Sequence, residues 1–157
     1  MSRIDHALDT ARRRYRRLPA AEVPWAVARG AILVDIRPHS QRESEGEIPG
    51  ALTIERNVLE WRCDPTSDAK VPQAVDDHVE WVLVCSTGRT SSLAVAALLD
   101  LGLHRATDVI GGYHALRDVD VAPRSIHPAA GRAFARSASP REQRQRVDLA
   151  LAGRRWM

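Results

Sequence analysis

Apolar residues follow two spacings along the chain, which predict a helix near its start and short buried strands after it. Between Ile4 and Leu18 they recur in steps of three and four, typical of an amphipathic helix, and Ser2 is a suitable cap. Runs rich in branched apolar residues predict strands over 31–36, 51–54, 81–84 and 107–110.

Segments of helical composition separate the later strands. Residues 91–101 precede Gly102, a stop signal, and residues 113–117 can form a short helix. Strands that alternate with helices predict an α/β fold with a small, mainly parallel central sheet flanked by helices. Ligands bind at the carboxyl ends of such strands, and Cys85 follows the predicted strand 81–84 at that edge.

The last part of the chain predicts an extension. Large apolar residues become few after position 121, and Ser139-Pro140 followed by Glu142 signals the start of a helix over 140–156. We therefore expect a basic N-terminal helix (1–17), a central domain (18–120) and a basic C-terminal extension (121–157).

The composition is that of one folded globular domain: 157 residues, 44% hydrophobic and 27% charged. No apolar run approaches the roughly 20 residues of a membrane span, and no signal peptide is visible, so we expect a cytoplasmic protein. Cys63 and Cys85 form no C-x-x-C pair, which argues against a disulfide scaffold or a cysteine zinc cage. The six histidines lack the spacing of a metal site.

Charge is distributed unevenly. Residues 1–17 hold six arginines against two aspartates, and residues 123–157 hold eight arginines against two acidic residues. The region between them holds nine basic and sixteen acidic residues. The pI of about 9.4 therefore belongs to the two ends. No aromatic platform or base-reading motif accompanies these arginines, so we expect no nucleic-acid partner. The ends are instead expected to meet the acidic domain of the same chain or of a neighbour.

The segment from Cys85 to Ser91 carries the candidate chemistry. A cysteine that follows a strand and precedes a polar loop and a helix lies where loop N–H groups and the helix dipole converge. That setting favours a thiolate, which is the nucleophilic form. Gly88 permits the turn and Arg89 adds positive charge. Hydroxyls that can donate to a sulfur anion come from Ser86, Thr87, Thr90 and Ser91. The loop alone also fits a small buried cysteine beside an ordinary turn.

Four motifs, in order, resemble the rhodanese family over about 18–120. Leu33–Arg37 looks like the first-strand motif, and Gly46–Ala51 is similar to the turn G-H-I-P-G-A. Cys85–Ser91 matches C-x-x-G-x-x-S, and Gly111–Leu116 resembles G-G-x-x-A-W. The resemblance implies the three-layer rhodanese-like fold, in its single-domain form.

The resemblance also implies a sulfurtransferase in which Cys85 is the nucleophile. The cysteine takes the outer sulfur of thiosulfate or another sulfane donor, holds it as a persulfide and passes it to cyanide or a thiol. It implies no metal and no organic cofactor. The expected partners are a small sulfur-containing donor and a thiol or cyanide acceptor that can be a protein, without a membrane partner. The terminal helices are the places where a second copy would pack in a homodimer.

Three positions depart from the family pattern. Glu47 replaces the usual histidine of the turn, and Leu116 replaces the usual tryptophan. Many active members have arginine at the fifth position after the cysteine, where this chain has Thr90, with Arg89 one place earlier. Donor preference is therefore expected to differ from that of thiosulfate enzymes.

Two further residues are predicted to reach the same edge of the sheet. Asp35 lies at the end of the first predicted strand, and Arg56 follows the second, so we expect both to bind substrate. The other residues expected to bind substrate are those of the loop: Ser86, Thr87, Gly88, Arg89, Thr90 and Ser91. The simpler roles of Asp35 and Arg56 are an anchor for loop amides and a surface ion pair worth under about 1 kcal/mol. The segment Glu60–Cys63 can form a wall of the pocket. The simpler roles are core packing for Trp61 and an inert thiol, rather than a resolving cysteine, for Cys63.

Two other function classes stay open. The first is a non-catalytic rhodanese-like module that binds a protein or senses redox state. The second is a phosphatase or arsenate reductase on the same fold. Such enzymes resemble C-x5-R, in which the arginine grips the oxyanion, whereas the sixth residue after Cys85 is Ser91.

Overall fold

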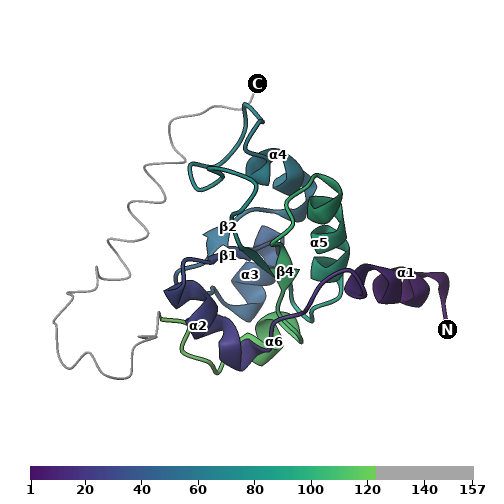
Figure 1. The fold of residues 1–157 in the computed structure, drawn as a ribbon. Coiled ribbons are helices and arrows are strands. Elements are labelled where there is room, and N and C mark those ends of the chain that lie inside the picture. Colours follow the sequence, from purple (N-terminus) through teal and green to yellow (C-terminus); the bar gives the residue numbers. More distant parts are fainter. Residues whose placement is uncertain (123–157) are drawn as a thin grey trace, which may run out of the picture.

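The computed structural model describes residues 1–122, so the predicted helix 140–156 and nearly all of the predicted extension lie outside the described residues. At its centre is a four-stranded parallel sheet in the order β2-β1-β3-β4 (Figure 1). The strands are β1 (Ile32–Asp35), β2 (Leu52–Thr53), β3 (Trp81–Val84) and β4 (Thr107–Asp108). The predicted α/β fold with a small parallel sheet is confirmed.

Helices cover both faces of the sheet and complete the three layers (Figure 1). One face packs against α4 (Leu59–Cys63) and α5 (Thr90–Asp100), and the other packs against α2 (Val23–Ala28) and α6 (Gly112–Leu116). Successive side chains of a strand point to opposite faces. Val34 and Leu83 therefore join the core with α4 and α5, whereas Leu33 and Val82 join the core with α2 and α6.

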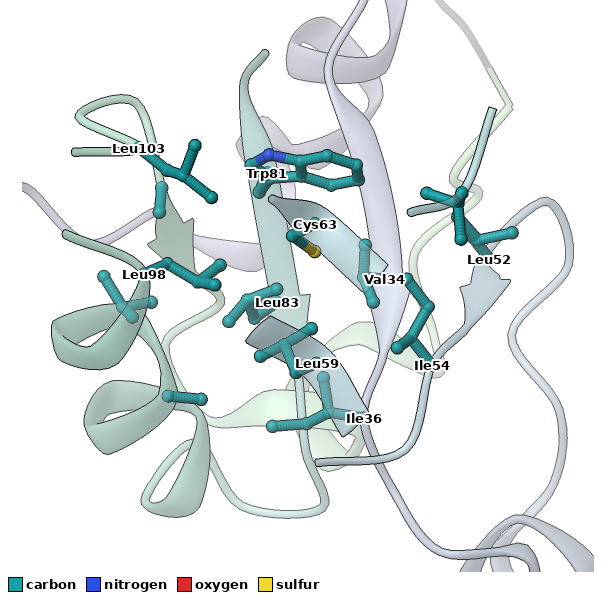
Figure 2. Close-up of a cluster of buried hydrophobic side chains, with 14 of the residues drawn as sticks. Val34, Ile36, Leu52, Ile54, Leu59, Cys63, Trp81, Leu83, Leu98 and Leu103 are labelled. Atoms are coloured by element: carbon teal, nitrogen blue, oxygen red, sulfur yellow. The ribbon is translucent and has the colours of Figure 1, made fainter. Parts of the chain in front are cut away.

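The core between the sheet, α4 and α5 is shown in Figure 2. Trp81, Leu83 and Leu59 are fully buried in it. Burying a leucine side chain of this kind stabilises the fold by about 1.5–3 kcal/mol relative to leaving it in water. This core fixes the end of β3 and the beginning of α5, which are the two ends of the cysteine loop.

The N-terminal helix α1 (Arg3–Arg12) begins with a capping box. The Ser2 hydroxyl accepts the Asp5 N–H at 3.2 Å, and the Asp5 carboxylate accepts the Ser2 N–H at 3.0 Å. Leu8 and Ala11 are buried on the side where α1 packs against α5. The amphipathic spacing therefore predicted Leu8 and Ala11 on the contact face correctly, whereas Ile4, the first residue of the spacing, is exposed.

Helix α1 ends at Arg12, short of the predicted end at residue 17. The next residues run along the edge of the sheet instead. The Leu18 N–H donates to the Asp108 carbonyl and the Leu18 carbonyl accepts the Ile110 N–H, both at 2.9 Å. This parallel bridge continues the sheet beyond β4 and satisfies backbone groups that would otherwise form an open edge.

The remaining described elements are short: η1 (Ala20–Glu22), α3 (His39–Glu45) and η2 (Arg56–Val58). Helix α3 follows β1 and has no buried residue, so no hydrophobic spacing predicted it. Within residues 1–122, no helix combines the length and the apolar character that crossing a membrane requires.

Candidate active site

Cys85 lies directly after β3 at the carboxyl edge of the sheet, and only 7% of it is exposed. The chain then forms the cysteine loop, residues 85–91, and enters α5 at Thr90. Helix α6 packs against the loop. The Tyr113 N–H donates to the Cys85 carbonyl at 2.8 Å, and the His114 N–H donates to the Ser86 carbonyl at 3.2 Å. The loop is thus held between the first turns of two helices.

The sulfur of Cys85 is surrounded by hydrogen-bond partners. It accepts the N–H of Gly88 at 3.2 Å and the N–H of Ser91 at 3.3 Å, and it lies 3.3 Å from the Ser91 hydroxyl oxygen. Ser91 belongs to the first turn of α5, where backbone N–H groups have no partner within the helix. Both N–H donors and the helix dipole favour negative charge on the sulfur.

Two glycines allow the close approach of the loop and α6. Gly88 has a φ of +78°, and a Cβ there would lie 2.9 Å from the Gly111 nitrogen. Gly112 has a φ of +60°, and a Cβ there would collide with the Cys85 carbonyl oxygen and lie 2.7 Å from the Gly88 nitrogen. Side chains at these positions would push apart the backbone that surrounds the sulfur.

The loop residues expected to bind substrate differ in their exposure and in their distance from the sulfur. Ser86 is half-buried, and its hydroxyl lies 2.7 Å from the Glu45 carboxylate and 3.0 Å from the Gln41 side-chain oxygen, both in α3. The exposed members are Thr87, Arg89 and Thr90. Only Gly88 and Ser91, among these residues, contact the sulfur in the described structure.

The loop arginine faces α1. The guanidinium of Arg89 lies 3.6 Å from the Asp5 carboxylate, and 63% of its side chain is exposed. Hydrogen bonds from Ser2, followed by the charge of Arg89, lower the pKa of Asp5, so this carboxylate stays an anion facing the arginine. Sequence reasoning expected the arginine beside the substrate, and could not anticipate Asp5 as its partner, because the two residues lie 84 positions apart along the chain.

Asp35 is buried at the end of β1 and its carboxylate is occupied. Arg37 donates to it from Nε at 3.0 Å and from Nη2 at 2.8 Å, and the Arg37 N–H donates at 3.1 Å. The same guanidinium donates to the Gly46 carbonyl at 2.7 Å and lies over the Tyr113 ring. Burial acts to lower the pKa of Arg37, but the hydrogen bond and charge of Asp35, together with the charges of Glu45 and Tyr113, raise that pKa. The structure places Asp35 as an anchor of the turn.

Arg56, the other predicted edge residue, lies in η2. Its guanidinium pairs with the Glu60 carboxylate one helical turn later at 2.5 Å, and both side chains are about one-third exposed. The structure therefore shows the surface ion pair that was the simpler interpretation of this arginine.

Two arginines of the N-terminal segment reach the cysteine loop, a contact that sequence reasoning missed. Arg12 and Arg17 each donate to the Gly88 carbonyl at 2.8 Å. These two bonds tie the Gly88 carbonyl of the cysteine loop to the N-terminal segment. The sequence does show four arginines outside the apolar spacing of the predicted helix: Arg12, Arg13, Arg16 and Arg17. Their spacing alone is equally typical of a solvated helix face.

Cys63 lies in the core and not beside Cys85. It is fully buried at the end of α4, among Trp81, Leu83 and Val34 (Figure 2). Burial, followed by the charge of Glu60, raises the pKa of Cys63 from 9.0 to about 12. Both cysteines are free thiols. Among residues 1–122, no group of three or more His, Cys, Asp or Glu side chains is arranged to hold a metal ion.

The architecture and the loop define a three-layer α/β domain with a cysteine cradled by backbone N–H groups at the carboxyl edge of its sheet. The family model for the rhodanese-like domain matches residues 20–118. The chain therefore belongs to the rhodanese-like domain family.

Solved structures agree with this assignment. A protein of unknown function from Rhodopseudomonas palustris, described as a possible tyrosine phosphatase, is 31% identical, with a TM-score of 0.66 over 75% of this chain and 91% of that one. The human single-domain sulfurtransferase TSTD1 is 25% identical, with a TM-score of 0.54 over 68% of this chain and 98% of that one.

One curated relative carries a sulfurtransferase name. It is the adenylyltransferase and sulfurtransferase UBA4 of Lodderomyces elongisporus, which is 32% identical over 92 residues. The match covers 57% of this chain and 20% of the relative, so the chain spans about one-fifth of that protein's length.

Proposed function

We propose that this chain is a sulfurtransferase that carries a sulfane sulfur as a persulfide on Cys85. The observation that carries the proposal is the pair of N–H groups, from Gly88 and Ser91, that both point at the Cys85 sulfur. A persulfide has its negative charge one atom further out and lies in the same field of N–H groups, which favours this intermediate as well as the thiolate.

The reaction divides into two displacements at sulfur. The Cys85 thiolate attacks the outer sulfur of thiosulfate, forming a new S–S bond while the old S–S bond breaks and sulfite leaves with its electron pair. A thiolate acceptor, or cyanide, then attacks the outer sulfur of the persulfide. The product is a new persulfide or thiocyanate, and Cys85 leaves as the thiolate. No external oxidant or reductant is needed, because the sulfane sulfur is transferred as such.

The donor does not have to be thiosulfate. The family pattern has arginine at the position of Thr90, and here Arg89 faces Asp5 of α1. The loop therefore brings less side-chain positive charge to a doubly charged donor than the family pattern does. We propose small persulfides and thiosulfate as competing donors, with a small thiol or a protein thiol as acceptor.

The direct test is mass spectrometry of the intact protein after incubation with thiosulfate or with a low-molecular-weight persulfide. One added sulfur atom is expected, it should map to Cys85, and dithiothreitol should remove it. Cys85→Ser should take up none, and the matched variant Cys63→Ser should take up as much as the wild type. A folded wild type that takes up no sulfur from any donor would overturn the proposal.

The same protein preparation separates the alternatives. Hydrolysis of an aryl phosphate that disappears in Cys85→Ser would favour the phosphatase interpretation, for which the described loop offers Ser91 where C-x5-R has its arginine. Absence of both sulfur uptake and hydrolysis would favour a binding or redox-sensing module. Deletion of residues 123–157 tests that module further, because a tail that serves a partner should be dispensable for sulfur transfer.

A further inference from the structure

Asp108, the last residue of β4, is a carboxylate with no exposure to solvent beside the cysteine loop. Its oxygen Oδ1 accepts the Tyr15 hydroxyl at 2.8 Å and Arg17 Nε at 2.9 Å. Its oxygen Oδ2 accepts Ser91 Oγ at 2.7 Å, Ser92 Oγ at 2.9 Å and Arg17 Nη2 at 3.1 Å. A buried charge needs such partners, and these come from α5 and the N-terminal segment.

The donors of Asp108 are well matched to an anion. Burial, followed by the charge of Asp108, raises the pKa of Tyr15, so its hydroxyl keeps the hydrogen that it donates. Burial acts to lower the pKa of Arg17, but the hydrogen bond and charge of Asp108 outweigh it and raise that pKa. The carboxylate is therefore held as an ion-paired acceptor next to Ser91.

Ser91 stands between this carboxylate and the reactive sulfur. Its oxygen lies 2.7 Å from Asp108 Oδ2 and 3.3 Å from the Cys85 sulfur. A hydroxyl has one hydrogen to donate, so Ser91 can donate to Asp108 or to Cys85 but not to both. Hydrogen bonds to carboxylates are short and strong, which favours the hydrogen on the Asp108 side.

The direction of the Ser91 hydrogen determines whether the sulfur faces a lone pair or a hydrogen of that hydroxyl. When Ser91 donates to Asp108, its oxygen presents a lone pair to Cys85 and accepts a hydrogen bond from the thiol S–H. When Cys85 loses its proton, the same lone pair faces an anion. The thiolate gains a third donor only if Ser91 turns its hydrogen away from Asp108.

We propose that Asp108 is a positioning residue that sets the balance between thiol and thiolate at Cys85 by competing for the Ser91 hydrogen. Asp108 touches neither the sulfur nor a substrate in this role. The inference rests on the proposed function only in taking Cys85 as the nucleophile. In this role Asp108 withholds the Ser91 hydrogen from the thiolate, whereas the two backbone N–H donors stabilise the thiolate.

Other charged groups around the cysteine loop are engaged with partners of their own. The carboxylate of Glu45 in α3 accepts the Ser86 hydroxyl and lies 3.6 Å from the ring of His114 in α6. At β1, Arg37 is paired with Asp35, and at the loop rim Arg89 is paired with Asp5. From the N-terminal segment, Arg12 donates to Ser92 and to the Gly88 carbonyl. None of these pairs includes the Asp108 carboxylate.

The test is the pH dependence of iodoacetamide alkylation at Cys85, measured per cysteine by mass spectrometry on the full chain. Asp108→Asn removes the charge that attracts the Ser91 hydrogen, so the midpoint of the rate profile should fall by about one pH unit, a tenfold larger thiolate fraction at a given pH. The same substitution in a Ser91→Ala background should move the midpoint by less than one-third of that amount.

Two results with these variants would overturn the proposal. An unchanged midpoint in Asp108→Asn would show that the competition has no effect. An equal shift with and without Ser91 would assign the effect to the charge of Asp108 acting directly on the sulfur. Failure of sulfur uptake by the wild type would overturn the proposed function but not this inference, since alkylation reports on the thiol itself.

A second variant covers the case in which Asp108→Asn does not fold, as judged by near-UV circular dichroism. Ser92→Ala removes one donor from Oδ2, so Asp108 holds the Ser91 hydrogen more strongly and the alkylation midpoint should rise by about half a pH unit. When both variants fold, a merely loosened loop would not produce shifts of opposite sign, because loss of the N–H donors would raise both midpoints. A midpoint that stays or falls in Ser92→Ala would contradict the proposal.

Discussion

Cys63 and Cys85 are both free thiols beneath the surface, yet they lie in opposite chemical surroundings. Cys63, at the end of α4, has no exposure and packs among aliphatic and aromatic side chains (Figure 2). Cys85 is 7% exposed and its sulfur receives N–H groups from Gly88 and Ser91. Burial by itself therefore does not distinguish the proposed nucleophile from a thiol of the core. The difference comes from backbone donors, which one site has and the apolar core does not offer.

The largest expected effect comes from replacing each cysteine by serine. Cys85→Ser should lower the rate of sulfur transfer by at least about 10³-fold, because the hydroxyl is a far weaker nucleophile at neutral pH. Cys63→Ser should keep the rate within about threefold and instead cost about 1–3 kcal/mol of stability, since it buries a hydroxyl among apolar groups. Steady-state kinetics and urea unfolding of both variants check this pair. Comparable loss of activity in the two variants would show that both thiols take part.

The next effect tests whether backbone approach makes the Cys85 site. Gly112→Ala places a Cβ against the Cys85 carbonyl and the Gly88 N–H, so we expect a loss of about 10²-fold in kcat/KM through displacement of the loop. The matched control is Gly102→Ala, which has a φ of +87° but no atom within 4 Å of the added Cβ. It should cost about 1 kcal/mol of stability and leave kcat/KM unchanged. Equal kinetics in the two variants would rule out this account of the loop.

The stability of the fold at alkaline pH tests the raised pKa of Cys63. Its folded-state pKa of about 12 lies above the ordinary 9.0, so the folded state disfavours the thiolate. The stability that depends on the neutral thiol is complete below pH 9 and is lost as pH rises toward 12. Relative to Cys63→Ser, the wild type should lose up to about 1.4 kcal/mol per pH unit in that range. Parallel stability curves for the two proteins would contradict the raised pKa.

The smallest expected effect concerns side-chain charge near Cys85. Arg89→Ala should lower kcat/KM for thiosulfate by about threefold, because an exposed charge is screened by solvent and this one is paired with Asp5. Asp5→Asn, which releases the arginine, should raise it by less than about threefold, and both effects should shrink in 0.5 M salt, a concentration at which screening acts over about 4 Å. A tenfold or larger loss in Arg89→Ala would instead place this guanidinium on the donor in the transition state.

Local pattern predicted much of the fold and the cysteine loop. The runs at 31–36 and 81–84 contain the strands β1 and β3, and the step after the second run placed Cys85 at the edge of the sheet. Helix α3 escaped prediction because His39–Glu45 buries nothing and so has no apolar spacing. The end of α1 was predicted too late, because the apolar spacing continues to Leu18, whose backbone instead bonds to the sheet edge beside β4.

Residues close together along the chain are enough to predict the parallel α/β class and the position of Cys85 after a buried strand. They also carry the four ordered motifs that resemble the rhodanese family. The distant groups that hold the cysteine loop in place follow from the tertiary structure alone. Arg12 and Arg17 meet the Gly88 carbonyl, and Asp108 meets Ser91, across long stretches of chain. Such contacts depend on how helices and strands pack, because hydrogen bonds act over a few ångströms in space and not along the sequence.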